Sequence, residues 1–483
     1  MNMIINGEKT GFEGREELIV TNPADGTVID TVPKASESDV DRAIEAAQIG
    51  TRVWRSVPLY ERIEILNRFG TLVLEKNEEI GTIMCKETGK TLASCIQEVK
   101  DCVHIFRVYC EKARNFGGET LPQNSEARVN GDVIFTLVQP IGVVGCIIPF
   151  NYPLELYAHK VAPALTMGNA VIIKPASDTP LSAILVTELL LQAGVPAGAA
   201  QILTGSGSAI GTRLARSPKV DAVSLTGSVR AGISLIENGA KTLKNTYLEL
   251  GGNDPLIIFE DVDLDAAVEE ALLGRASNAG QTCCGTKRFL VQNTVRDIFT
   301  RKLREALEKL KVGDPMNPET DFGPLISEAA AIEVEEQVNQ TIRQGARLIC
   351  GGKRFNKTYF KPTILSDVTV DMDIAKDMEI FGPVFPIIGF DTEDEALEIA
   401  NAAPYGLSSG VMTAKMDTAL RIATKIEAGT CVINGCGNYR SAHMAFGGPK
   451  MTGLGREGAV YTLTEYTRIK NIALKQMLKE VNE

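Results

Sequence analysis

Three short segments place a cysteine, a carboxylate and an amide at separate points of the chain. Cys283 follows a glycine and a glutamine, Glu249 ends an apolar run before two glycines, and Asn151 follows another apolar run. A thiolate attacks carbonyl carbons, a carboxylate activates water, and an amide N–H donates to the oxyanion that the attack creates. Brought together, these groups would form a thioester and then hydrolyse it, which is the chemistry of aldehyde oxidation.

Each of these residues also has a purely structural interpretation. Cys283 could be a packed thiol, and Glu249 could be an ion-paired carboxylate of the framework. Asparagine is favoured at helix N-caps, and for Asn151 taken alone this interpretation is the stronger one. A carboxylate at the end of an apolar strand is costly to bury, however, unless it has a task. The combination therefore favours a catalytic site.

Composition limits the class of protein. A chain of 483 residues should divide into two or three domains. Its net charge of −11 carries no basic block, which argues against a nucleic-acid partner. The N-terminus does not resemble a secretory signal and the apolar runs are too short to span a membrane, so we expect a cytoplasmic protein. The ten cysteines form no CxxC pair and there are three histidines, so we expect no metal site.

From about Gly142 onwards, strand-like runs alternate with helical segments. Strands are predicted at 142–148, 170–173, 200–203 and 220–224, with helices at 154–165, 181–192 and 209–216. This alternation predicts a parallel sheet that binds ligands at the carboxyl ends of its strands. A second α/β unit is predicted from near Gly251. Residues 128–138 and 464–473 are predicted to form a small β-unit for subunit contacts.

The glycine-rich segments give a weak indication of a dinucleotide site. The segment 205–211 does not fit the dinucleotide fingerprint, because Ile210 occupies the third glycine position. At the next strand end, Thr226-Gly227-Ser228 is predicted to supply backbone and hydroxyl groups at a helix N-terminus. Neither segment identifies the ligand by itself.

Taken jointly and in order, these segments resemble the aldehyde dehydrogenase superfamily over essentially the whole chain. The motifs that carry the resemblance are Pro149-Phe150-Asn151-Tyr152-Pro153, Gly168-Asn169 leading to Lys174-Pro175, Thr226-Gly227-Ser228, Glu249-Leu250-Gly251-Gly252, Gly280-Gln281-Thr282-Cys283, Glu379-Ile380-Phe381-Gly382-Pro383-Val384, Pro404-Tyr405-Gly406-Leu407, and Phe446-Gly447-Gly448 through Gly455-Arg456-Glu457. Each motif alone is weak, whereas the ordered set is specific.

The resemblance implies an α/β fold of the aldehyde dehydrogenase type in three parts. A Rossmann-like cofactor-binding domain would comprise residues 1–121 and 141–250, and a catalytic α/β domain residues 251–455. A small β oligomerisation arm and tail would comprise 122–140 and 456–483. The expected assembly is a homodimer or a homotetramer.

The resemblance also implies the roles of individual residues. Cys283 would be the nucleophile, Glu249 the general base and Asn151 the oxyanion donor, acting together with the backbone N–H of the nucleophile. Hydride would pass from the thiohemiacetal to a nicotinamide, and water would hydrolyse the thioester to a carboxylic acid. Lys174 would hold the adenosine ribose and Glu379 the nicotinamide ribose. The cofactor-binding set is Pro149, Phe150, Lys174, Ser177, Gly207, Thr226, Gly227, Ser228, Leu250, Glu379 and Phe381.

Ser177 indicates which nicotinamide cofactor is preferred. Relatives that prefer NAD carry a glutamate three residues after the ribose-binding lysine, and Ser177 replaces it here. A carboxylate would repel a 2′-phosphate, whereas serine leaves room and can donate a hydrogen bond. Arg230 and Lys174 would supply positive charge. We therefore expect NADP to be preferred, with NAD as the alternative.

The substrate side departs from the most similar branch of the superfamily. Succinic semialdehyde dehydrogenases carry arginines at the positions of His159 and Ser277, and lactaldehyde dehydrogenases also favour arginine at the first. Both carboxylate anchors are thus absent. His159 fits a substrate contact and a buried helix residue equally well. The predicted substrate-site residues are Tyr152, His159, Thr282, Arg440 and Phe446, and we expect a small polar or anionic aldehyde, lactaldehyde-like or semialdehyde-like.

Two other functions compete with this interpretation. Acylating relatives pass the acyl group to coenzyme A and often lack the base, so the presence of Glu249 favours water as the acceptor. A catalytically inactive structural relative is the second alternative. The joint presence of Cys283, Glu249, Asn151, Lys174 and Glu379 argues against it.

Overall fold

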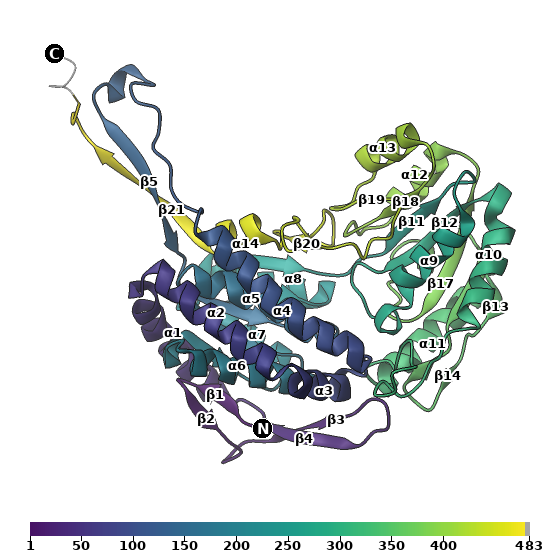
Figure 1. Cartoon of the computed structure of the whole chain (residues 1–483), viewed down its shortest axis with the longest axis horizontal. Helices are drawn as coiled ribbons and strands as arrows, with labels where there is room; N and C mark the ends of the chain where they lie inside the picture. Colours follow the sequence, from purple (N-terminus) through teal and green to yellow (C-terminus); the bar gives the residue numbers. More distant parts are fainter. Residues whose placement is uncertain (479–483) are drawn as a thin grey trace.

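Two large, mostly parallel sheets form the framework of the computed structural model, which describes residues 1–478 (Figure 1). The first sheet has the order β2 (Glu8–Thr10), β1 (Met3–Ile5), β8 (Ala200–Ile202), β7 (Ala170–Lys174), β6 (Val143–Ile147), β9 (Ala222–Thr226), β10 (Asn245–Glu249) and β20 (Gly453–Leu454). Its five central strands are parallel, while β1 and β20 pair antiparallel to their neighbours. The parallel sheet expected from the alternating pattern is thereby confirmed.

Helices cover both faces of this sheet. They are α1 (Glu37–Ser56), α2 (Leu59–Glu75), α3 (Asn77–Thr88), α4 (Leu92–Ala113), α5 (Pro153–Thr166), α6 (Leu181–Ala193), α7 (Gly207–Arg216) and α8 (Val229–Gly239). Side chains alternate along a strand, so Val144 packs with α2, α4, α5 and α6, whereas Val143 packs with α1, α7 and α8. Because strands such as β6 and β7 are buried on both faces, their sequences are continuous apolar runs without alternating polar residues.

The second sheet has the order β13 (Arg347–Cys350), β16 (Thr363–Val368), β17 (Val384–Phe390), β12 (Thr286–Gln292), β11 (Asp254–Ile258), β18 (Gly410–Met412) and β19 (Val432–Ile433). All its neighbouring pairs are parallel except β13 with β16. One face packs on α9 (Leu264–Arg275) and α10 (Asn293–Leu307). The other packs on α11 (Glu328–Arg343), α12 (Glu393–Asn401) and α13 (Met416–Lys425).

A two-stranded arm projects from the body of the molecule (Figure 1). It consists of β5 (Val133–Pro140) and β21 (Thr467–Leu474), which pair antiparallel along their full length. The sequence placed the first of these strands at 128–138, but residues 127–129 form a 3-10 turn and the strand starts at Val133. Two further hairpins are β3 (Glu17–Thr21) with β4 (Val28–Pro33), and β14 (Arg354–Phe355) with β15 (Tyr359–Phe360).

The C-terminal part of the chain returns to the first sheet. β20 falls within the predicted catalytic range 251–455, yet it extends the first sheet beside β10. Helix α14 (Ala459–Glu465) then buries Leu463 in the core of that same unit. Residues 479–483 of the predicted tail lie outside the described residues. The residue boundaries of the three predicted parts therefore stay a prediction. In the described chain, no helix is both long and apolar enough to cross a membrane.

Candidate active site

The loop that carries Cys283 has an unusual backbone. It joins a short turn at Ser277–Gly280 to β12, and Asn278, Ala279 and Gly280 all have positive φ. A Cβ on Gly280 would lie 2.2 Å from the carbonyl oxygen of Gly382, so a side chain is excluded there. The bend leaves Cys283 half-buried at the end of the loop and Cys284 buried behind it.

Asn151 faces this loop from the first sheet. Its Nδ2 donates to the carbonyl oxygen of Gln281 at 3.0 Å, and Asn278 Nδ2 donates to the Asn151 carbonyl oxygen at 3.1 Å. The helix-cap interpretation is wrong, because the N-cap of α5 is Tyr152 and no side chain caps it. An amide has two N–H donors, so one remains for a ligand beside Cys283.

Glu249 ends β10 and is buried beside Cys283. Its exposure is 4%, and neither carboxylate oxygen has a hydrogen-bond partner within residues 1–478. Burial, reinforced by the negative charge of Glu457, raises the pKa of Glu249 to about 7. A general base works best when its pKa lies near the working pH, so this carboxylate has the properties of one.

The Cys283 thiol is held in its protonated form by its surroundings. Contact with Cys284, burial and the negative charge of Glu249 together raise the pKa of the Cys283 thiol well above its usual value. Because only the thiolate is strongly nucleophilic, the thiol must lose its proton before it attacks. Glu249 is the neighbouring carboxylate able to accept that proton.

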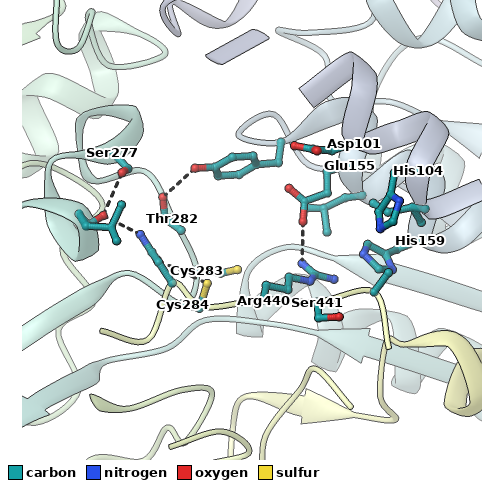
Figure 2. Close-up of a pocket in the computed structure, with 16 residues that line it drawn as sticks. Asp101, His104, Glu155, His159, Ser277, Thr282, Cys283, Cys284, Arg440 and Ser441 are labelled. Carbon is teal, nitrogen blue, oxygen red and sulfur yellow. Dashed lines mark hydrogen bonds and ion pairs between the residues drawn. The ribbon is translucent and has the colours of Figure 1, made fainter. Parts of the chain in front are cut away.

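A pocket of about 490 Å³ opens above Cys283 (Figure 2). Its lining is Asp101, His104, Ile105, Tyr152, Glu155, Leu156, His159, Leu273, Ser277, Thr282, Cys283, Cys284, Asn438, Arg440, Ser441 and Ala442. Four of the five predicted substrate residues are among them. Phe446 is the exception: it packs on Cys284 and lines a smaller adjoining cavity that also contains Glu249.

His159 combines the two interpretations that its sequence position left open. It is buried on α5, and its Nδ1 lies 3.2 Å from the hydroxyl oxygen of Tyr109. Burial, together with the positive charge of Arg440, lowers the pKa of His159 well below its usual value. The ring is therefore neutral, and it presents a polar but uncharged surface to the pocket.

Arg440 carries the positive charge of the pocket wall. Its Nη1 lies 3.5 Å from Glu155 (Figure 2). Its Nη2 lies 2.7 Å from Glu457, and the guanidinium covers the ring of Phe446 at 3.9 Å. Its buried Nε has no partner in the described part of the chain. A guanidinium has five N–H donors, so Arg440 retains hydrogen-bonding capacity toward a ligand.

The predicted cofactor residues gather at the carboxyl edge of the first sheet. A cavity of about 420 Å³ there is lined by Gly207, Ser228 and Arg230, with apolar surface from Ile147 and Leu225. Gly207 starts α7, and the Ser228 hydroxyl caps α8 by accepting from the Ala231 N–H. Two helix N-termini thus bound one cavity, an arrangement that suits phosphate groups.

Lys174 ends β7 close to Gly207, and Ser177 lies three residues further on. Burial, partly offset by Asp178, lowers the pKa of Lys174 to about 8. A Cβ on Gly207 would lie 3.5 Å from the Lys174 Nζ, so glycine leaves the ammonium accessible from that side. The Ser177 hydroxyl donates to the Gly205 carbonyl oxygen at 3.0 Å. Ser177 therefore contributes small size and neutrality, since its one O–H is already used.

The remaining predicted cofactor residues lie between this cavity and Cys283. Glu379 Oε1 accepts from the Gly252 N–H at 3.2 Å, and Phe381 meets Phe150 edge to face at 6.0 Å. Pro149 and Phe150 follow β6, Thr226 and Gly227 lie at the end of β9, and Leu250 follows β10 directly.

Several residues of the pocket were missed by the sequence analysis. Asp101, His104 and Ile105 lie on α4 at helical spacing, and Glu155 shares one face of α5 with His159. The spacing on α5 could have found Glu155. No local pattern shows that α4 packs along α5, and this packing brings Asp101 to the pocket.

Comparison with known proteins gives consistent matches. A family model described as the aldehyde dehydrogenase family matches residues 11–472. The succinate-semialdehyde dehydrogenase [NADP(+)] of Escherichia coli strain K12 is 37% identical, covering 98% of this chain and 97% of that protein. A 3-sulfolactaldehyde dehydrogenase of Pseudomonas putida is 37% identical, covering 97% and 96%.

Solved structures agree with these matches. The crystal structure of an E. coli NADP-dependent enzyme superposes with a TM-score of 0.95 at 37% identity, over 98% of each chain. Betaine aldehyde dehydrogenase from Staphylococcus aureus in complex with NAD+ gives a TM-score of 0.95 at 33% identity, over 98% of this chain and 95% of that one.

Proposed function

We propose, from the premise that the chain belongs to the aldehyde dehydrogenase family, that it oxidises a small polar or anionic aldehyde to its carboxylic acid through a thioester on Cys283. Membership of the family gives the chain its fold and makes it an oxidoreductase that oxidises aldehydes with a nicotinamide cofactor. The observation that carries this proposal is the convergence of Cys283, Glu249 and Asn151 from three distant segments. Appearance of reduced cofactor on mixing with a panel of small aldehydes tests it.

In the first half of the reaction, Glu249 accepts the thiol proton and the Cys283 sulfur forms a bond to the aldehyde carbon. The carbonyl π electrons move to oxygen, and the oxyanion receives hydrogen bonds from the free Asn151 N–H and the backbone N–H of Cys283. Bound oxidised cofactor supplies the acceptor for the hydride on that carbon. The hydride loss leaves a thioester on Cys283.

In the second half, Glu249, once it has released the thiol proton to solvent, takes a proton from water as the water oxygen attacks the thioester carbon. The same donors stabilise the second oxyanion. As the C=O bond re-forms, the C–S bond breaks, the acid is released, and Glu249 returns a proton to the Cys283 sulfur. The raised pKa of Glu249 suits this task, because a carboxylate of ordinary pKa would be a weaker base.

We propose that NADP is the preferred cofactor and that NAD also binds. Arg230 lines the cavity that two helix N-termini border, and the Lys174 ammonium lies beside Gly207, which lines the same cavity. The similarity to the NADP(+) enzyme of E. coli supports the same choice.

Ser177→Glu is expected to reverse cofactor preference. A carboxylate in place of the hydroxyl would face the 2′-phosphate, and opposed like charges cost several kcal/mol, so the NADP-to-NAD ratio of kcat/KM should fall at least about tenfold. Ser177→Ala, which removes the hydroxyl and adds no charge, is the matched control and should keep the NADP preference. A wild-type enzyme with higher kcat/KM for NAD would contradict the proposal.

We propose that Arg440 recognises the polar or anionic end of the substrate. It lines the pocket and retains free N–H donors, including the unpartnered Nε among the described contacts. The neutral His159 and the hydroxyl of Tyr152 offer further polar contacts without charge.

Arg440→Gln is expected to raise the KM for carboxylate- or sulfonate-bearing aldehydes about 10- to 100-fold. This range corresponds to the loss of one hydrogen bond between charged groups. The KM for a neutral aldehyde of the same length, such as propanal, should change far less in the same preparation. Equal loss for both substrate classes would mean that Arg440 serves only its ion pairs with Glu155 and Glu457.

The acceptor of the acyl group follows from the presence of the general base. We propose that water is the acyl acceptor, because Glu249 is present; a requirement for coenzyme A would overturn this.

We also propose a cytoplasmic homodimer or homotetramer that uses the β5–β21 arm. The ten free thiols fit a reducing compartment, and the arm exposes Leu137, Ile469 and Leu474. Light scattering of the purified protein measures the assembly.

A further inference from the structure

Lys287 is a buried cation directly behind the nucleophile loop. Its side chain is 1% exposed, and its Nζ donates to the carbonyl oxygens of Thr282 at 3.1 Å, Cys283 at 2.5 Å and Gly285 at 3.4 Å. The Glu379 carboxylate lies 3.3 Å away on the cofactor side. Four acceptors therefore surround an ammonium that has three N–H donors.

A local irregularity of the second sheet coincides with Lys287. The register between β11 and β12 shifts there: Asp254 pairs with Thr286, whereas Pro255 pairs with Arg288, and Lys287 is the extra residue. Such bulges redirect side chains, often beside active sites. By simple alternation Lys287 would share the face of Phe289, which packs on α9 and α10. Instead its ammonium binds the loop that carries Cys283.

The carbonyl of Thr282 and the N–H of Cys283 belong to one peptide unit. A positive charge on the carbonyl oxygen draws electron density through the amide and leaves the N–H a stronger donor. The same contact fixes the direction in which that N–H points. Resting on the proposed function, in which this N–H binds the oxyanion, we propose that Lys287 is a positioning residue that orients and polarises the Thr282–Cys283 peptide for oxyanion binding.

The other charged groups around Lys287 indicate that its ammonium acts mainly on the loop carbonyl oxygens and does not form a single ion pair. Glu379 is shared with the Gly252 N–H, and Asp254 is buried with its Oδ2 unpartnered in the described chain. When Glu379 binds a ribose, Lys287 loses part of this competing acceptor. Its hydrogen bonds to the three loop carbonyls then become its principal interactions.

The test compares two reactions of Cys283 that need no cofactor. Hydrolysis of 4-nitrophenyl acetate passes through an oxyanion, whereas alkylation by iodoacetamide at a saturated carbon does not. Rates are measured at the pH plateau of each variant, so that changes in thiol ionisation do not enter. Lys287→Met should lower the ester rate about 10- to 100-fold, a fraction of the loss of a whole oxyanion donor, and the alkylation rate less than about threefold. Aldehyde kcat should fall with the ester rate, with little change in KM.

Three controls keep the inference falsifiable. Lys244→Met removes a lysine that donates to the carbonyls of Ser217 and Val220 far from Cys283, and it should leave both rates unchanged. The double variant Lys287→Met/Glu379→Gln balances the lost charge; the ester rate should stay low, and its recovery would show that Lys287 only neutralises Glu379. If Lys287→Met does not fold, Lys287→Gln, which keeps an N–H donor without the charge, replaces it.

The outcomes separate this inference from the proposed function. Equal loss of ester hydrolysis and alkylation would mean that Lys287 merely holds the cysteine in place, and unchanged ester hydrolysis would remove the role altogether. Failure of the proposed function itself would appear in Cys283→Ala with Lys287 intact, as ester hydrolysis that survives loss of the thiol.

Discussion

Cys283→Ala should lower aldehyde oxidation by at least about 10⁴-fold, because the covalent intermediate forms on its sulfur. The neighbouring Cys284 also lines the pocket, but it is buried and its thiol donates to Asn438 Oδ1 at 3.6 Å, so we expect it not to replace the lost thiol. Reduced cofactor is followed by its absorbance under saturating aldehyde. No burst of reduced cofactor should precede the residual rate.

The matched control for this change is Cys431→Ala, which removes a half-buried thiol of the second sheet region. It should keep wild-type turnover. Cofactor affinity of Cys283→Ala, measured by quenching of protein fluorescence, should stay within about twofold of wild type, since binding does not depend on the thiol. Retention of more than one per cent of the activity would reject Cys283 as the nucleophile.

Glu249→Gln should separate the two halves of the reaction. Hydrolysis of the thioester needs a base, and loss of a general base lowers a rate about 10²- to 10⁴-fold. Removing the Glu249 charge also removes one cause of the raised thiol pKa. At alkaline pH, where the thiol ionises to solvent, stopped-flow mixing should therefore show formation of up to one equivalent of reduced cofactor per subunit, followed by slow turnover. The trapped acyl-enzyme should be visible as an added mass on Cys283.

The pH dependence gives a second measure of the same carboxylate. Its pKa is raised to about 7, so Glu249 is protonated below that pH and acts as a base above it. When deacylation limits turnover, kcat of the wild type should rise from pH 6 to pH 8 and then level off. This rise should disappear in Glu249→Gln. If Glu249→Gln shows no burst, and reduced cofactor forms in the first turnover as slowly as in steady-state turnover, Glu249 would instead serve mainly to deprotonate the Cys283 thiol.

Much of the framework was predictable because it depends on local patterns. Continuous apolar runs such as 143–147 and 170–174 become strands buried on both faces, and the helices between them impose parallel pairing. The same alternation predicted that ligands bind at the carboxyl ends of the strands, since parallel strands end on one side of the sheet. Cys283, Glu249 and Asn151 were identified from residue type, neighbouring glycines and the resemblance to a family.

Other parts of the site depend on contacts between distant segments. Arg440 forms ion pairs with Glu155 and Glu457, and its guanidinium packs on the ring of Phe446, which lies outside the main pocket. No spacing pattern in the sequence predicts either contact. β20 joins the first sheet although it follows the whole second unit. These relations arise from the packing of complete elements, which local periodicity does not encode.

The amino-acid sequence by itself determined the main secondary-structure elements and indicated the strand ends and reactive side chains of the candidate site, because each follows from residue type and short-range spacing. The tertiary structure decided their electrostatic state. It buried Glu249 beside Cys283, surrounded Lys287 with carbonyl oxygens, and left His159 neutral. Proton affinities depend on desolvation and on charges within a few ångströms, and these are set only when remote segments meet.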